Sequence, residues 1–315
     1  MYIRNMKSFL KKTIKYILGK KSMIPQDQAL VLYPSLALKQ LSTVNTENRI
    51  DSIIFSKDRA IQLHAFIESY FEKVDGADRL FVLYKATGEH VSSYEELKQV
   101  WSGYDVQFIE ETDFRKQLNE ICVKSTAKLL GFYVDDMIFT ECVSYNEILR
   151  YNPLEYIVCL SRGLDFTYSQ VLNKTMALPV FERMEDSAFY SFHWDYSDEF
   201  NDWTYPLGVS AYFYSRHEIV AMFDLIFYKA PNSLESAMQI LMPYFKVRKG
   251  LCMDRISCCC VPVNMVQEEC VNPVTGHIST QGLLEKWNQG LKIDISKFEK
   301  VGVKGIYMDY EYITR

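Results

Sequence analysis

The sequence contains little glycine, with 13 glycines among 315 residues, and no glycine-rich loop follows any strand that we predict. Neither G-x-G-x-x-G nor G-x-x-x-x-G-K-[ST] occurs. These two patterns surround nucleotide phosphates with backbone N–H groups, so their absence excludes a Rossmann dehydrogenase and a P-loop nucleotidase. Any phosphate recognition must therefore rely on side chains or a metal ion.

Long apolar runs and paired cysteine motifs are also absent. No uninterrupted run reaches the roughly 20 residues that a membrane-spanning helix needs, and the first residues lack the central apolar block of a secretory signal. No C-x-x-C pair is present, so reduced cytoplasmic thiols are favoured over a disulfide framework or a zinc site. The eight cysteines are Cys122, Cys142, Cys159, Cys252, Cys258, Cys259, Cys260 and Cys270.

Charge is unevenly distributed along the chain. The net charge of −5 argues against nucleic-acid binding, yet residues 1–22 carry seven Lys or Arg and no acid. On a helical wheel Arg4, Lys7, Lys11, Lys12 and Lys15 fall opposite Tyr2, Ile3, Met6, Phe9, Leu10, Ile14 and Ile17. This pattern is typical of a helix at a membrane interface, so we expect residues 1–22 to bind an anionic membrane surface from the cytoplasm. A solvated tail, or a helix docked on its own domain, is the alternative.

Short apolar runs and helical periodicity alternate from residue 51 to residue 140. We predict strands at 51–56, 79–86, 105–111 and 132–136, with helices at 60–74, 92–101 and 114–130 between them. Such alternation predicts an α/β fold, a doubly wound and mostly parallel sheet flanked by helices. Residues 1–50 are expected to form the basic amphipathic helix and an irregular linker, and 141–315 a less regular second half of the same domain.

Charged side chains follow two of the predicted strands. Ser56-Lys57-Asp58-Arg59 follows the first strand, and Asp135-Asp136 follows the fourth, where ligands of such sheets bind. The two carboxylates adjoin an apolar stretch, and burying them costs several kcal/mol unless they turn into solvent or meet a cation. A hard divalent cation, Mn²⁺ or Mg²⁺, prefers carboxylate oxygens and retains positions for phosphate oxygens.

These motifs, in this order, resemble those of the GT-A class of glycosyltransferases, and in particular bacterial enzymes of capsule or O-antigen biosynthesis. The stretches that carry the resemblance are "SKDR", "FYVDD", "HWDYSDEFNDWTYPLGVSAYFYSRHEI", "APNSLE" and "VPVNMVQEE", within residues 51–315. The pair is D-D rather than a full D-x-D. The resemblance implies a nucleotide-sugar-binding half at 51–140 and an acceptor-binding half at 141–315.

The resemblance also implies roles for the residues of the first half. Asp136 would hold the metal, and Asp135 would contact the metal or the nucleotide ribose. Lys57 and Arg59 would face the diphosphate or the base, with Asp58 beside them. A third metal ligand is expected late in such folds, where His277, Asp309 and Glu311 are the candidates.

For the second half we expect a catalytic base and a saccharide site. An inverting transfer needs a base for the acceptor hydroxyl, and Glu235 at a predicted helix start suits that role. Asp198 and Asp202 are the alternative bases. Trp194 and Trp203 offer flat faces for a sugar ring, unless they pack within the core of their loop. Asp195, Asp198 and Asp202 can accept hydrogen bonds from sugar hydroxyls.

The sequence therefore predicts a metal-dependent, inverting hexosyltransferase that uses a nucleotide-sugar donor, with UDP-sugar the first candidate. The acceptor would be a saccharide or lipid-linked saccharide in polysaccharide biosynthesis. Two alternatives remain open at this point. A sugar nucleotidyltransferase shares a related sheet and a need for metal, although it usually has a glycine-rich basic loop after its first strand. A noncatalytic carbohydrate-binding protein would need only the tryptophans.

Overall fold

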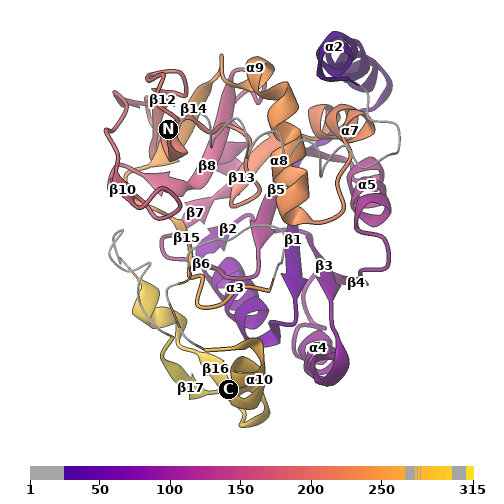
Figure 1. Ribbon diagram of the computed structural model, residues 1–315, viewed down its shortest axis with the longest axis vertical. Coiled ribbons are helices and arrows are strands. Elements are labelled where there is room, and N and C mark those ends of the chain that lie inside the picture. Colours follow the sequence, from indigo (N-terminus) through magenta and orange to yellow (C-terminus); the bar gives the residue numbers. More distant parts are fainter. Residues whose placement is uncertain (1–24, 267–273, 275, 277, 300–309) are drawn as a thin grey trace, which may run out of the picture.

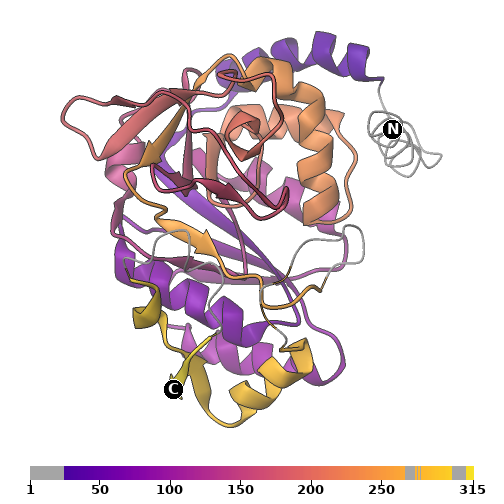
Figure 2. The same cartoon turned by 60° about the vertical axis from the view of Figure 1, so that its left-hand side comes forward.

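The computed structural model describes residues 25–266, 274, 276, 278–299 and 310–315. Within them a large central sheet lies between layers of helices, as Figures 1 and 2 show. The predicted α/β fold with a sheet flanked by helices is confirmed. The basic segment 1–22, His277 and Asp309 lie outside the described residues, so the helix expected at the start of the chain is not part of this description.

One nine-stranded sheet runs through both predicted halves of the chain. Neighbouring strands pair in parallel from β5 to β4 and between β8 and β14, whereas β13, β12 and β11 pair antiparallel with their neighbours. In spatial order the strands are β11 (Glu182–Arg183), β12 (Phe189–His193), β14 (Lys249–Met253), β8 (Tyr156–Gly163), β13 (Tyr212–Ser215), β5 (Ala127–Val134), β1 (Glu47–Lys57), β3 (Leu80–Lys85) and β4 (Val106–Glu110).

The helices cover both faces of the parallel part of the sheet. Helices α3 and α4 connect β1, β3 and β4 in one direction and pack with α10, whereas α5 returns across the sheet to β5 and packs with α7 on the other face. This is the arrangement that right-handed crossovers produce. Because both faces are covered, the central residues of β1 and β3 are buried without alternation, which explains their continuous apolar runs.

The remaining elements are short or lie at the ends of the molecule. The helices are α2 (Gln26–Thr43), α3 (Ala60–Lys73), α4 (Val91–Val100), α5 (Phe114–Lys124), α6 (Tyr145–Ile148), α7 (Arg216–Leu225), α8 (Pro231–Met238), α9 (Met242–Phe245) and α10 (Thr280–Asn288), with 3-10 turns η1 (Gly88–His90), η2 (Asp202–Thr204), η3 (Gln239–Leu241) and η4 (Ile295–Phe298). Two-stranded pairs join β2 (Val74–Asp75) to β7 (Val143–Ser144), β6 (Met137–Phe139) to β15 (Cys258–Cys260), β9 (Tyr168–Ser169) to β10 (Lys174–Thr175), and β16 (Leu291–Ile293) to β17 (Tyr312–Thr314).

The expectation of an irregular linker before the sheet is wrong for residues 26–43, which form α2. Its inner face packs on the molecule through Ala29, Tyr33 and Ala37. Pro34 cannot donate the helical hydrogen bond to the Leu30 carbonyl, and the Tyr244 hydroxyl donates to that carbonyl instead, at 2.6 Å. A partner distant in the sequence therefore stabilises a helix that the local pattern does not announce.

Two further boundaries differ from the prediction. The helix expected over 114–130 ends at Lys124, because Ser125 adopts an extended conformation and Ala127 begins strand β5. Strand β14 and helix α10 were not anticipated at all. The cysteines among the described residues are free. No helix among those described is long and apolar enough to cross a membrane.

Candidate active site

The two charged motifs, about 80 residues apart in the sequence, meet at one edge of the sheet. Strands β1 and β5 are parallel neighbours, with Phe55 opposite Val134, so their carboxyl ends lie side by side. Asp135 and Asp136 form the turn between β5 and β6, and Arg59 follows the end of β1. Both motifs therefore lie at the carboxyl edge of the sheet, as the sequence predicts.

Arg59 is the cation that faces the acidic pair. Its Nη1 atom lies 3.0 Å from Asp135 Oδ1 and 3.1 Å from Asp136 Oδ2, and its Nη2 donates to the Asn264 carbonyl at 2.6 Å. Burial lowers the pKa of this guanidinium, but the two carboxylates raise it more, so Arg59 is held charged. Its buried Nε has no hydrogen-bond partner among the described residues, which leaves one donor unused.

Asp135 accepts hydrogen bonds through both of its carboxylate oxygens, from the end of β1 and from Arg59. Its Oδ1 accepts from Arg59, while Oδ2 accepts from the Ser56 hydroxyl at 2.8 Å and the Lys57 N–H at 3.1 Å. Burial raises the pKa of Asp135, and Arg59 partly offsets that effect. Since both carboxylate oxygens already accept hydrogen bonds, Asp135 fits the role of holding the end of β1 against the end of β5.

Asp136 is the better fit for a divalent cation. Its side chain is 14% exposed, and within the described part of the chain only Arg59 donates to it, through one of its two oxygens. No group of three or more metal-ligating side chains occurs among the described residues. A Mg²⁺ or Mn²⁺ ion here would therefore complete its coordination with phosphate oxygens and water, as Mg²⁺ commonly does beside one or two carboxylates.

Lys57 and Asp58 connect the end of β1 to its surroundings. Asp58 adopts a left-handed conformation, with φ of 53°, and its carboxylate accepts from the N–H and the hydroxyl of Thr87 at 2.7 and 2.9 Å. Lys57 Nζ lies 3.4 Å from the Val266 carbonyl. The carboxylate of Asp58 is thus used within the protein, whereas the Lys57 ammonium lies at the same sheet edge as the acidic pair.

Sequence reasoning missed Tyr94, which supports the cluster from α4. Its hydroxyl is 2.5 Å from the Ser56 hydroxyl and accepts from the Arg59 N–H at 3.1 Å. The ring is fully buried, and burial followed by Asp135 raises the pKa of its hydroxyl, so Tyr94 remains a neutral hydrogen-bonding group. Nothing in its local sequence distinguishes it from the other 21 tyrosines.

A second charged cluster contains the predicted base. Arg162 ends strand β8, is buried, and lies 3.6 Å from Asp202 Oδ1. Glu235 Oε2 accepts from the Val209 N–H at 3.0 Å, and its carboxylate interacts electrostatically with Arg162 and Asp202. Burial raises the pKa of Glu235. Two buried atoms, Arg162 Nε and Asp202 Oδ2, have no hydrogen-bond partner among the described residues.

The local setting of Glu235 differs from the expected one. It lies in the second turn of α8, and the Ser233 hydroxyl accepts from the N–H groups of Lys229 and Ala230 at the helix start. The Val209 N–H, rather than a free amide of that helix start, therefore contacts the Glu235 carboxylate.

Both clusters act electrostatically on the Cys260 thiol. Burial raises the pKa of this thiol most, Asp136 raises it further, and Arg162 lowers it. Asp136 and the candidate base Glu235 are 99 residues apart in the sequence.

The tryptophans do not present faces to a ligand. Trp194 and Trp203 are fully buried, and both rings pack on Phe192, with centroids 4.6 and 4.9 Å from its ring. Trp203 Nε1 donates to the Phe166 carbonyl at 3.0 Å. The prediction that these rings stack on a sugar is therefore wrong for this structure, and the alternative of a packed loop core holds.

The remaining expected residues are distributed over the surface. Asp195 and Asp198 are exposed, and Asp195 lies 3.9 Å from His193. Of the three predicted acids, Asp195, Asp198 and Asp202, only Asp202 joins the Glu235 cluster. Glu311 pairs with Lys297 at 3.1 Å.

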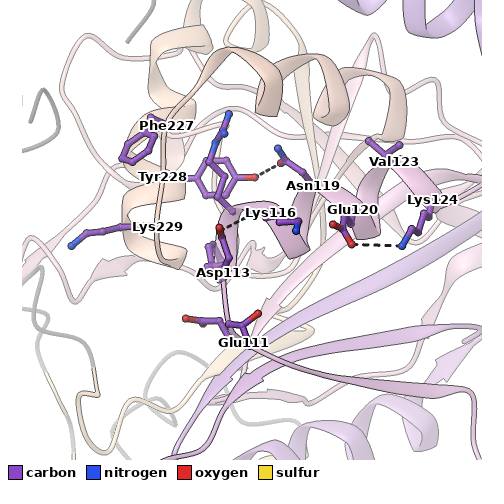
Figure 3. Close-up of a pocket in the computed structure, with 13 residues that line it drawn as sticks. Glu111, Asp113, Lys116, Asn119, Glu120, Val123, Lys124, Phe227, Tyr228 and Lys229 are labelled. Carbon is purple, nitrogen blue, oxygen red and sulfur yellow. Dashed lines mark hydrogen bonds and ion pairs between the residues drawn. The ribbon is translucent and has the colours of Figure 1, made fainter. Parts of the chain in front are cut away.

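A cleft of about 740 Å³ lies beyond the end of β4, between the start of α5 and residues 227–229. Figure 3 shows Glu111 and Asp113 at its lower side, and Tyr228 hydrogen-bonded to Asn119 above them. Phe227 is 48% exposed there. None of the predicted site residues lines this cleft. The stretch "EETD" at 110–113, which spans the end of the predicted strand 105–111, is the signal available in the sequence, by the same strand-end rule.

The chain is similar to one curated protein at the level of sequence. No family model matches the chain. It is 25% identical over 224 residues to the bifunctional glycosyltransferase pgtA of Dictyostelium discoideum, which covers 65% of this chain and 27% of that protein. The chain thus spans about a quarter of the length of the curated relative that it matches.

Solved structures give weaker similarities. A mannosyltransferase from Pyrobaculum calidifontis, in complex with GDP-Man and Mn²⁺, is 16% identical over 44% of each chain, with a TM-score of 0.30. Residues 1–349 of TarS from S. aureus are 10% identical over 65% of this chain and 58% of that chain, with a TM-score of 0.40. A nucleotidyl transferase from Methanothermobacter thermautotroptrophicus is 11% identical over 67% of this chain and 89% of that chain, with a TM-score of 0.38. All three scores are below 0.5.

Proposed function

We propose that this chain is a glycosyltransferase that moves a sugar from a nucleotide diphosphate donor to a saccharide acceptor. The observation that carries the proposal is the meeting of Arg59 with Asp135 and Asp136 at the carboxyl ends of two adjacent parallel strands. The sequence similarity to a glycosyltransferase from Dictyostelium supports the same class of reaction.

The donor half of the site uses Arg59 and Asp136. We assign the donor as a UDP-sugar, with its diphosphate beside Arg59 and Lys57, and Asp136 as the protein ligand of Mn²⁺ or Mg²⁺. The bound ion supplies Lewis-acid stabilisation of the leaving diphosphate. Arg59 keeps an unused Nε donor for a phosphate oxygen, and Asp135 holds the two strand ends together.

The acceptor half of the site uses Glu235. The carboxylate accepts the proton of the acceptor hydroxyl while that oxygen forms a bond to the anomeric carbon. The bond between the anomeric carbon and the diphosphate breaks at the opposite face, and its electron pair leaves on the phosphate oxygen. One base and one displacement invert the anomeric centre. Arg162 and Asp202, beside Glu235, fix its charge environment and bind acceptor hydroxyls.

The acceptor and its location complete the proposal. The acceptor is a saccharide or a lipid-linked saccharide in polysaccharide biosynthesis, as in bacterial capsule or O-antigen pathways. The basic residues 1–22 associate with an anionic membrane surface on the cytoplasmic side.

A thermal-shift screen of nucleotide sugars, with and without Mn²⁺, tests the donor assignment. We expect UDP and one UDP-sugar to raise the melting temperature only when Mn²⁺ is present, because Asp136 would hold the ion and the ion would neutralise the charge of the diphosphate. Asp136→Asn should remove the Mn²⁺-dependent shift and slow transfer by about 100-fold or more. The exposed Asp186→Asn is the matched control and should change neither. A variant Asp136→Asn with normal metal-dependent binding and transfer would contradict the assignment.

The pH dependence of transfer tests the base. Glu235 acts only when deprotonated, and burial raises its pKa above the ordinary value of 4.5, so the rate should increase with pH through an inflection above that value. Glu235→Gln should lower kcat by about 100-fold or more and remove the inflection while donor binding persists. If Glu235→Gln keeps the inflection, the base is a residue other than Glu235. Asp202→Asn then tests the alternative base.

A further inference from the structure

Helix α2 has an outward face that no described residue covers. Val31 is 75% exposed and Leu38 is 65% exposed, and they lie seven residues apart on the same side of the helix. Leu32 and Leu41, each 43% exposed, flank them. Within its 18 residues α2 carries only Asp27 and Lys39 as charged side chains. The exposed residues on that side also include Gln28, Ser35, Lys39 and Ser42, so the outer face combines large apolar side chains with uncharged polar ones and one lysine.

The inner face of α2 is fixed firmly to the rest of the molecule. The Tyr33 hydroxyl donates to Glu218 Oε1 at 2.9 Å, and Glu218 forms an ion pair with Arg248 at 2.6 Å. Arg216 donates to Gln40 Oε1 at 3.0 Å near the other end of the helix. Helix α2 is therefore held in one orientation on the molecule, and Figure 2 shows it along the upper edge.

The sequence that precedes α2 indicates what this face meets. Residues 1–22 carry seven Lys or Arg and no acid, and three residues separate them from α2 in the sequence. An anionic lipid surface satisfies both features together, because its headgroups attract the cations and its acyl boundary accepts the apolar side chains. Stable attachment to a bilayer commonly needs two such signals, since one alone gives weak and reversible binding.

We infer that the outer face of α2, formed by Val31, Leu32, Leu38 and Leu41, is a second membrane-binding surface that acts together with the basic residues 1–22. This inference rests on the membrane association proposed above and is independent of the chemistry of sugar transfer. The occupant is the surface of a bilayer that contains anionic phospholipid.

Attachment through α2 would also set the distance between the candidate active site and the bilayer. Strand β1 begins four residues after α2 and ends at Lys57, beside Arg59, and Figure 1 shows it running away from α2. Its 11 residues span roughly 33 Å at the usual rise per residue. A chain attached through α2 would hold its site about that far from the bilayer, which favours an acceptor whose sugar end extends well beyond the lipid headgroups.

Vesicle flotation of the full-length chain tests this inference. We compare vesicles of equal parts phosphatidylcholine and phosphatidylglycerol with vesicles of phosphatidylcholine alone. The variant Val31→Asp/Leu38→Asp should bind the anionic vesicles at least about tenfold more weakly than the wild type, because two apolar side chains no longer enter the interface. The matched control is Val91→Asp/Val100→Asp, with the same change of charge on α4, where both valines are 45% exposed. It should bind as the wild type does.

A variant of the basic segment separates this inference from the proposal beneath it. Lys11→Glu/Lys12→Glu/Lys15→Glu should also weaken binding, and strongly so at low salt. If this variant fails to bind while the α2 variant binds normally, the α2 inference is overturned and the role of residues 1–22 stands. If the wild type does not bind anionic vesicles, both are overturned.

Two further measurements exclude other occupants of the face. A second copy of the chain would appear in sedimentation as a dimer that the α2 variant converts to a monomer, and residues 1–24 packed on α2 would appear as a lower melting temperature of that variant. Either result, with vesicle binding unchanged, would overturn the inference. We expect the α2 variant to have the same oligomeric state as the wild type. Its melting temperature should lie within about 2 °C of that of the wild type.

Discussion

Arg248 and Arg59 are both buried arginines that pair with carboxylates, and their surroundings differ. Arg248 meets Glu218 with two nitrogens, at 2.6 and 2.8 Å, and also donates to the Pro153 carbonyl. Arg59 divides a single nitrogen between Asp135 and Asp136 and leaves its buried Nε without a partner in the described structure. The first pair lies beneath α2, and the second lies where β1 and β5 end.

The difference indicates which cluster supports the fold and which is available to a ligand. A bidentate pair that is enclosed by protein has its hydrogen bonds satisfied, so it contributes to one rigid arrangement. A pair with unused donors and a partly exposed carboxylate oxygen retains capacity for a ligand. Closed and open are our terms for the Arg248–Glu218 and the Arg59–Asp135–Asp136 clusters, respectively.

The largest expected effect is on stability, at the closed cluster. Glu218→Gln leaves the buried Arg248 without its charge partner, which typically costs about 3–5 kcal/mol of unfolding free energy. Urea unfolding measures this loss. Transfer activity per folded molecule should remain normal, because Glu218 is distant in sequence and structure from the β1 and β5 ends. The control Glu182→Gln, which breaks an exposed pair with Lys249, should cost less than about 1 kcal/mol. Equal losses in the two variants would contradict the distinction.

The sequence predicted the ends of the strands better than the partners at those ends. Apolar runs define β1, β3 and β5, and alternation with helices makes their carboxyl ends meet, so the edge that holds Asp136 was predictable. That Arg59 turns to the acids rather than outward depends on the register of β1 against β5 and on Asn264, which is 205 residues away. No local pattern contains that information.

Burial of aromatic residues was equally hard to read from the sequence. Trp194 and Trp203 lie in a polar, irregular segment, which favoured exposed rings, but Phe192 and the end of β12 enclose them. Helix α2 escaped prediction because a proline interrupts it and few charges define a polar side. In each of these places a tertiary contact overrides the local signal.

His64 is a buried titratable side chain without a carboxylate partner among the described residues. Its substitution should have an intermediate effect on stability. His64 lies between Trp101 and Trp287, with ring centroids 5.4 and 5.7 Å away, and its Nδ1 has no partner among the described residues. Burial, with a smaller effect from Lys292, lowers its pKa from 6.5 to about 4. The native state therefore holds His64 neutral, and stability present above pH 6.5 is lost as the pH falls toward 4.

Substitution of this histidine should remove that pH dependence. Between pH 7 and pH 5 the unfolded chain gains a proton on His64 that the native state resists, which costs about 2 kcal/mol. His64→Phe keeps an aromatic ring between the two tryptophans. Between pH 7 and pH 5 its unfolding free energy should fall by about 2 kcal/mol less than that of the wild type. Unfolding free energies at both pH values measure the difference, with the exposed His193→Phe as control. An unchanged pH slope in His64→Phe would mean that His64 is protonated within the fold.

The smallest expected effect on stability is at the open cluster, in Asp136→Asn. Arg59 retains Asp135 and the Asn264 carbonyl as partners, and the Asp136 side chain is already partly exposed, so the loss should stay below about 1 kcal/mol. The variant also removes the neighbouring charge that raises the pKa of Asp135. Because a raised carboxyl pKa makes the native state less stable as the pH increases, Asp136→Asn should compare more favourably with the wild type at pH 8 than at pH 4. Urea unfolding of the variant and the wild type at pH 4 and pH 8 measures this difference. A loss as large as that of Glu218→Gln at every pH would mean that the cluster at the sheet edge is closed too, and that its acids serve the fold.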